Sequence, residues 1–165
     1  MTPDARRSTL EAVDRIVNRE SAAKDVLEKT VAVLRGRFDH YSWVGIYLVD
    51  GADLVLGPWD GPQATEHMRI PVGQGVCGAA AASGVTEIVG DVTVDERYLA
   101  CFPSTRSEIV VPIAFGGRVV GEIDIDSDAP SAFDDDDRMF LERVATLVSL
   151  HVAHEAAAHS SSAGA

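Results

Sequence analysis

Apolar residues recur at helical spacing in two parts of the chain. Near the N-terminus the repeat is interrupted once, close to Glu20–Ala22, so it predicts one or two amphipathic helices over residues 3–36. After Pro130 a second stripe of the same spacing predicts one long helix, and its members are Phe140, Val144, Leu147, Val148 and His151.

Between these helical segments the pattern changes to short runs of β-branched and aromatic residues. Two hairpins are predicted, over residues 41–59 with a turn at Asp50-Gly51 and over residues 107–127 with a turn at Gly116-Gly117. Because hairpins dominate, the expected fold class is α+β, with a mainly antiparallel sheet and helices packed on it.

The region between the two hairpins is expected to hold smaller elements. Short strands are predicted at residues 65–72 and 85–91. Residues 73–84 indicate a glycine turn that opens a short alanine-rich helix, which Gly84 ends. Residues 92–106 are expected to be mostly loop.

Length and charge narrow the classes of function. A chain of 165 residues fits one domain with a sizeable core. The formal net charge of −12 argues against nucleic acid and against anionic membrane surfaces as partners. No apolar run is long enough to span a membrane, and the N-terminus lacks a signal-peptide stretch, so a cytoplasmic protein is expected. In a reducing compartment its two cysteines are expected to be reduced, catalytic or redox-active.

The two cysteines each allow two interpretations. Cys77 lies in GQGVCG, which formally fits a dinucleotide-binding fingerprint, but the neighbouring hairpins argue against that site. In the first turn of a helix the pKa of Cys77 would be lowered, although the residue could equally be a small packing residue. Cys101 stands seven residues before Glu108 and could be core packing or a reactive thiol near a carboxylate.

Acidic and aromatic residues mark two further faces. Strand alternation places Glu122, Asp124 and Asp126 on one face, which either faces solvent or forms a carboxylate cluster for an ammonium group. Trp43 and Tyr47 share a face of their strand and are either core residues or the walls of a small pocket.

Two other groups of titratable residues are assigned ordinary roles. Asp134 to Asp137 are expected at the N-terminus of the last helix, where the helix dipole favours acids, rather than in a cation site. The histidines on or just after that helix, His151, His154 and His159, have no zinc-ligand spacing. No metal site and no bound cofactor are expected.

Six ordered stretches together resemble a known family. WVGIY, LVLGPW, GQGVCG, YLAC, SEIVVPI and GEIDID follow one another from about Tyr41 to Val152. This set resembles the GAF-domain family of free methionine-(R)-sulfoxide reductases. The resemblance implies a six-stranded antiparallel sheet with helices packed on one side and a small-molecule pocket on the other. It places a single GAF domain at residues 1–157 and a flexible C-terminal tail at residues 158–165.

The resemblance also implies roles for individual residues. Cys101 matches the nucleophile of the family, and Cys77 matches the cysteine of its GVCG segment. The carboxylates that hold the substrate amino group in the family are matched by Glu108, Asp124 and Asp126. The aromatic residues around the substrate methyl group are matched by Trp43 and Tyr47. The family usually has a third cysteine, the common resolving partner, which would stand near Thr65 or His67 and is missing from this sequence.

The resulting hypothesis is a thioredoxin-linked L-methionine (R)-S-oxide reductase that acts in oxidative stress. Cys101 would become a sulfenic acid, which Cys77 or an external thiol would resolve, and thioredoxin and NADPH would supply the reducing equivalents. A homodimer is the favoured assembly, since domains of this kind often dimerise. Two alternatives remain open: a non-catalytic GAF module that binds a small regulatory ligand, and a thiol redox sensor.

Overall fold

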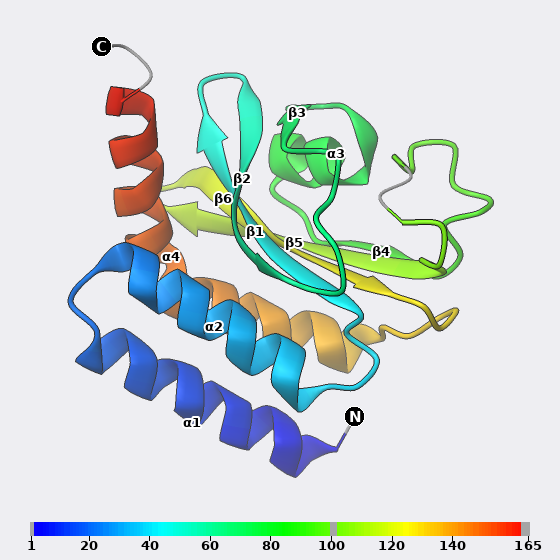
Figure 1. Ribbon diagram of the computed structural model, residues 1–165, viewed down its shortest axis with the longest axis horizontal. Coiled ribbons are helices and arrows are strands. Elements are labelled where there is room, and N and C mark those ends of the chain that lie inside the picture. Colours follow the sequence, from blue (N-terminus) through cyan, green and yellow to red (C-terminus); the bar gives the residue numbers. More distant parts are fainter. Residues whose placement is uncertain (1, 100–101, 163–165) are drawn as a thin grey trace.

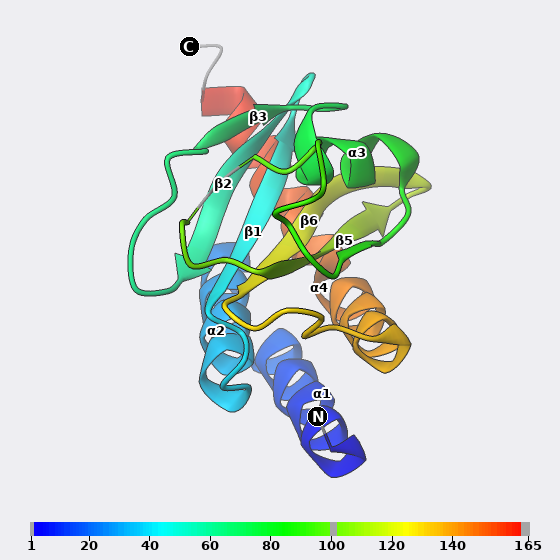
Figure 2. The same cartoon turned by 90° about the vertical axis from the view of Figure 1, so that its right-hand side faces the viewer.

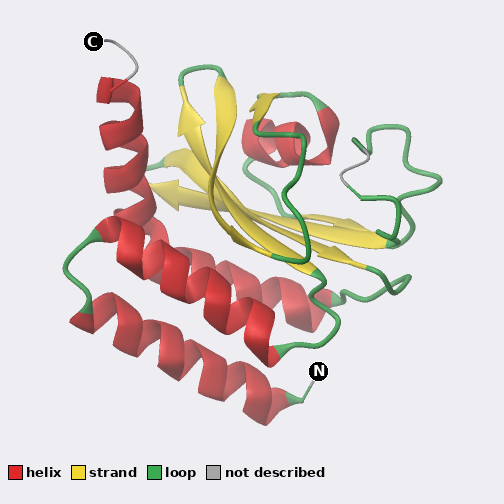
Figure 3. Cartoon of the chain, viewed as in Figure 1, coloured by secondary structure: helices red, strands yellow, loops and turns green. Residues whose placement is uncertain are grey.

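In the described part of the chain, the fold combines one antiparallel sheet with four helices. The computed structural model describes residues 2–99 and 102–162. The helices are α1 (Pro3–Arg19), α2 (Ala23–Arg37), α3 (Gly75–Ser83) and α4 (Asp135–Ser162). The strands are β1 (Trp43–Asp50), β2 (Asp53–Asp60), β3 (Arg69–Pro71), β4 (Glu87–Val89), β5 (Ser107–Phe115) and β6 (Arg118–Ser127). Figure 3 separates the red helices from the yellow sheet.

The six strands form one sheet in the order β3-β2-β1-β6-β5-β4, and every neighbouring pair is antiparallel. Its centre is the pairing of β1 with β6, which joins the two hairpins that the sequence predicts. Both hairpins are confirmed, as are the helix break near residue 20, the alanine-rich helix and the long last helix. The α+β fold class is therefore confirmed.

The layers of the molecule explain where a site can form. Helices α2 and α4 pack on one face of the sheet, and α1 lies alongside α2 on the side away from the sheet (Figure 1). Helix α3 lies on the opposite face, against β5 and β6 (Figure 2). Alternate residues of the central strands accordingly belong to two separate apolar clusters, one under the long helices and one under α3.

Two boundaries differ from the sequence prediction. Strand β3 covers only Arg69–Pro71, whereas a strand over 65–72 was expected. The hydroxyl of Thr65 accepts a hydrogen bond from the backbone N–H of His67, and this local turn takes the place of ladder pairing there. Helix α4 continues to Ser162, beyond the domain boundary drawn at residue 157. Within the described residues, no helix is both long and apolar enough to cross a membrane.

The acids at the start of α4 serve the helix terminus, as expected. Asp134 and Asp137 exchange hydrogen bonds between side chain and backbone N–H, which caps the helix. Arg6 of α1 reaches the same acids, with 3.1 Å between its Nη2 and Oδ1 of Asp137. Its side chain is only 11% exposed and that of Asp137 only 4%, so this ion pair anchors α1 to α4 in a largely dry position.

Replacing Arg6 by alanine is expected to lower the free energy of unfolding by about 2 kcal/mol, because the buried Asp137 loses its charged partner. Arg7→Ala is the matched control, since Arg7 and its partner Asp4 are 72% and 86% exposed, and it should change little. Urea denaturation followed by circular dichroism measures both variants. Equal stability of the two variants would show that the anchor contributes nothing.

Candidate functional site

The register of the central strands gathers the predicted site residues on the face under α3. Trp43 pairs with Asp126 and Tyr47 pairs with Glu122 across β1 and β6. Glu108 of β5 pairs with Asp126 from the other side. The alternation in these strands sends their isoleucines to the opposite face, under the long helices.

The acidic face of β6 is buried, so its interpretation as a solvent-facing strand is wrong. Glu122 is 0% exposed, Asp124 and Asp126 are 1% exposed, and Glu108 is 3% exposed. Six of the eight carboxyl oxygens of these residues have no hydrogen-bond partner within the described part of the chain. Burial of polar atoms without partners is unfavourable, so these oxygens are candidate acceptors for the donor groups of a ligand.

The electrostatics of the four carboxyl groups follow from this burial. Loss of solvation raises the pKa of Asp124 to about 7. Burial, followed by repulsion from neighbouring carboxylates, raises the pKa values of the other three well above their ordinary range. The raised pKa values therefore favour the protonated form of these carboxyl groups at neutral pH.

Glu122 belongs to this cluster, as one of the two interpretations of the strand alternation predicted, although the family resemblance assigned it no role. The sequence signal was present, since strand alternation puts it on the same face as Asp124. Only the structure shows that both of its carboxyl oxygens are buried and have no hydrogen-bond partner among residues 2–99 and 102–162.

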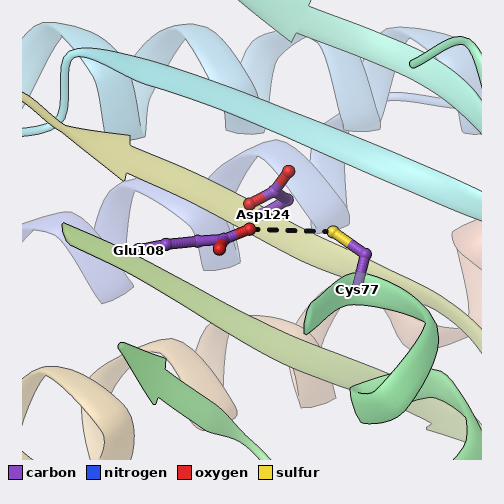
Figure 4. Close-up of side chains that lie close together, drawn as sticks. All are labelled: Cys77, Glu108 and Asp124. Atoms are coloured by element: carbon purple, nitrogen blue, oxygen red, sulfur yellow. Dashed lines mark hydrogen bonds between the residues drawn. The ribbon is translucent and has the colours of Figure 1, made fainter. Parts of the chain in front are cut away.

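Cys77 lies in the first turn of α3, as expected, and its side chain points toward the acids (Figure 4). Its Sγ is 3.9 Å from Oε1 of Glu108. The expected lowering of its pKa is wrong, however. Burial raises the pKa of the Cys77 thiol, and the nearby carboxylates raise it further, which outweighs the dipole of a short helix. Cys77 is therefore held as a neutral thiol.

Cys101, the expected nucleophile, lies outside the described residues. Its described neighbours in sequence contact two elements of the site. The side chain of Leu99 lies close to Gly75 at the start of α3. The ring of Phe102 is 5.8 Å from that of Trp43, measured between centroids.

The two predicted aromatic residues are both buried beside the carboxyl cluster. Trp43 stacks on Trp59 at 6.2 Å, and its own Nε1 has no described partner. The hydroxyl of Tyr47 donates a hydrogen bond to the carbonyl oxygen of His67 at 2.8 Å. Tyr47 therefore holds the segment around His67 against the site. The resemblance places the third cysteine of the family in this segment.

Two glycines make room for the indole of Trp43. A Cβ atom at Gly45 would stand 2.2 Å from Cη2 of Trp43, and one at Gly61 would stand 2.3 Å from its Cδ1. Since neither distance is tolerable between carbon atoms, side chains at these positions would displace the indole.

Gly45→Ala is expected to lower the free energy of unfolding by about 2 kcal/mol and to shift tryptophan emission to longer wavelength, because the indole is displaced toward water. Gly36→Ala is the control, since a Cβ there meets nothing within 4 Å and should stabilise α2 by ~0.5–1 kcal/mol. Chemical denaturation followed by fluorescence reports both effects. A Gly45→Ala variant as stable as Gly36→Ala would contradict the packing argument.

The geometry can be compared with that of known proteins. The family model described as GAF domain matches residues 22–152. The chain is 38% identical over 125 residues to the free methionine-R-sulfoxide reductase of Escherichia coli, covering 76% of this chain and 74% of that protein.

Solved structures agree with this match. That of the free methionine-R-sulfoxide reductase of Neisseria meningitidis, in complex with its substrate, has a TM-score of 0.85 at 38% identity and covers 94% of this chain and 95% of its own. The structure of the type II free methionine-R-sulfoxide reductase of Thermoplasma acidophilum has a TM-score of 0.78 at 37% identity. The match covers 80% of this chain and 93% of that one. These likenesses confirm the expected fold, while the small-molecule pocket under α3 stays a prediction.

Proposed function

The chain belongs to the GAF-domain family of free methionine-(R)-sulfoxide reductases, and we propose that it reduces free L-methionine-(R)-sulfoxide to methionine by thiol chemistry. The observation that carries the proposal is the set of buried carboxyl oxygens beside Trp43 and Tyr47 that have no hydrogen-bond partner in the described part of the chain. A free amino acid offers its ammonium group to such oxygens. A methionine sulfoxide residue inside a protein has no ammonium group to offer, so the site suits the free amino acid.

Asp124 is the main partner proposed for the substrate ammonium group. With its pKa at about 7, it is the carboxyl group of the cluster that ionises most readily near neutral pH. A bound ammonium group favours the ionised form further. Glu108 and Asp126 flank Asp124 and supply the remaining acceptors, while Trp43 and Tyr47 form the apolar surface for the methyl group.

The first chemical step assigns Cys101 as nucleophile. Its sulfur attacks the sulfoxide sulfur, the S–O bond breaks, and oxygen passes to Cys101 as the sulfenic acid while methionine leaves. The oxygen must be protonated during the transfer, and a protonated carboxyl group of the cluster is the natural acid. Glu108 is such a group, because burial raises its pKa well above the ordinary value. The thiol proton of Cys101 replaces the donated proton, so the step balances.

The second step regenerates the thiol. The Cys77 thiol condenses with the sulfenic acid to form a disulfide and water, and the dithiol of thioredoxin reduces the disulfide. Glu108, with Oε1 3.9 Å from the sulfur, is placed to take up the thiol proton of Cys77 as its own carboxyl proton leaves with the sulfenic-acid hydroxyl as water. An external thiol is the alternative resolving agent, because the chain lacks the third cysteine of the family.

Stereoselectivity provides the test. If the ammonium and methyl groups are held as proposed, the S epimer presents its oxygen on the wrong side of the sulfur. Purified protein is therefore incubated with each epimer of free methionine sulfoxide, together with thioredoxin, thioredoxin reductase and NADPH or with dithiothreitol alone. NADPH loss and methionine formation should occur with the R epimer only, and a peptide that contains methionine sulfoxide should not react.

Other outcomes would favour the other hypotheses. Turnover of neither epimer with either reductant would point to a non-catalytic ligand-binding module. Disulfide formation with peroxide, without any reaction with methionine sulfoxide, would point to a redox sensor.

A further inference from the structure

The cluster under α3 combines a thiol with carboxyl groups at short range. The sulfur of Cys77 and one carboxyl oxygen each of Glu108 and Asp124 all lie within 4.8 Å of one another (Figure 4). The three residues come from α3, β5 and β6, so the layering of helix on sheet brings them together.

The spacing suits a small tetrahedral cation. Zinc bonds of about 2.3 Å to sulfur and about 2.0–2.2 Å to oxygen place two such ligand atoms roughly 3.6 Å apart. The 3.9 Å between Sγ of Cys77 and Oε1 of Glu108 therefore needs to shorten by only ~0.3 Å. No ligand atom of the set starts more than 4.8 Å from another.

The carboxyl oxygens of the cluster provide a separate observation. Among the described residues, no hydrogen-bond partner reaches Oε2 of Glu108, Oδ1 of Asp124 or either carboxyl oxygen of Glu122, and these four atoms are buried. Glu122 and Asp124 are 0% and 1% exposed, so bulk water does not reach these oxygens. An ammonium group carries one positive charge and a divalent ion carries two. When the thiolate and both carboxylates of the set ionise, a bound divalent ion therefore leaves a net charge of only −1.

The sulfur ligand decides the class of cation. Thiolate favours zinc and other soft ions, whereas magnesium and calcium take oxygen ligands alone. We propose that Cys77, Glu108 and Asp124 bind a thiophilic divalent cation, with Zn²⁺ as the probe, and that the bound ion keeps the substrate ammonium group from the same carboxylates. Zinc then acts as a reversible inhibitor that also withholds the Cys77 thiol from disulfide formation. The inhibitory part rests on the proposed function, and the binding part does not.

Binding is measured in the absence of turnover. Reduced, metal-free Cys101→Ser protein, in which Cys77 is the only cysteine, is titrated with Zn²⁺ against a chromophoric chelator. One ion per chain is expected, and Co²⁺ in its place should produce a thiolate-to-cobalt charge-transfer absorption. A second substitution in the Cys101→Ser protein, either Cys77→Ser or Asp124→Asn, should weaken zinc binding at least ~10-fold and remove or alter the cobalt absorption. Asp135→Asn, which removes a carboxylate that is 81% exposed, should leave both unchanged.

Three results would overturn the inference. Equal zinc affinity with and without Cys77 would show an adventitious ion only. The same conclusion would follow if Asp135→Asn weakened zinc binding as much as Asp124→Asn does. Absence of the charge-transfer band would exclude the sulfur ligand.

Inhibition is tested with wild-type protein in single turnover, because the thiols of thioredoxin would themselves bind zinc. Prereduced enzyme is mixed with methionine-(R)-sulfoxide, and methionine is quantified with EDTA or with free zinc. Zinc should block the reaction competitively with substrate, and EDTA should restore it. Turnover that zinc does not change would refute the inhibition, whereas no turnover in EDTA would refute the proposed function and leave the binding result to stand.

Discussion

Asparagine in place of Asp124 is expected to make the protein more stable above pH 7 and yet to weaken substrate binding by at least ~100-fold, close to 3 kcal/mol. Affinity falls because the ammonium group loses its ionised partner in a site that excludes water. Stability rises because the amide has the shape of the carboxyl group but no charge to bury. An increase in stability together with a loss of binding distinguishes a ligand-binding acid from an acid that supports the fold.

The pH dependence of stability follows from the same residue. An aspartate in the unfolded chain has a pKa near 3.8, whereas burial raises the folded pKa of Asp124 to about 7. Between these values the folded state binds more protons than the unfolded state, so the free energy of unfolding falls as pH rises from about 4 to about 7. The full loss, present above pH 7, is on the order of 4 kcal/mol for this one group. The other three acids act in the same direction because their pKa values are also raised.

Thermal unfolding and isothermal titration with methionine, both in EDTA to exclude metal ions, measure these effects. The wild type should unfold at a lower temperature at pH 8 than at pH 5.5, and Asp124→Asn should reduce that difference. Asp14→Asn, which neutralises an exposed acid of α1, should leave both the pH dependence and the affinity unchanged. Full affinity in Asp124→Asn would mean that the ammonium group binds elsewhere.

Cys101→Ser is expected to abolish reduction of methionine-(R)-sulfoxide with thioredoxin and with dithiothreitol, since a serine hydroxyl cannot form the sulfenic acid. Cys77→Ser should behave differently. It should retain a single turnover and dithiothreitol-supported activity, because a small thiol can resolve the sulfenic acid directly, but lose most of its thioredoxin-supported turnover.

Mass spectrometry after one turnover tests the same assignment. Wild-type protein should lose two hydrogens as the disulfide forms, and Cys77→Ser should gain one oxygen, which a sulfenic-acid reagent would trap on Cys101. Both variants should still bind methionine, since neither removes a carboxyl group that holds it. Thioredoxin-supported turnover that survives in Cys77→Ser would show that Cys77 is not the resolving residue.

Local patterns in the sequence were sufficient for the elements of the fold. Apolar spacing located the helices, and the Asp50-Gly51 and Gly116-Gly117 turns located the hairpins, because those signals act between near neighbours. Strand alternation likewise placed Glu122, Asp124 and Asp126 on one face. The resemblance to the reductase family then joined these positions to Glu108 and the aromatic residues.

Only the tertiary structure decided what surrounds each of these side chains. The alternation of β6 is compatible with a face in water or a face under a helix, and the packing of α3 on β5 and β6 buries it. The same burial reversed the prediction for Cys77, because desolvation and neighbouring carboxylates outweigh a favourable position in a helix. Burial and charge at a site depend on residues far apart in the chain, whereas helix and strand periods depend on near neighbours. The sequence by itself therefore determined the elements and their faces, and the tertiary structure decided the burial and the charge environment of the site.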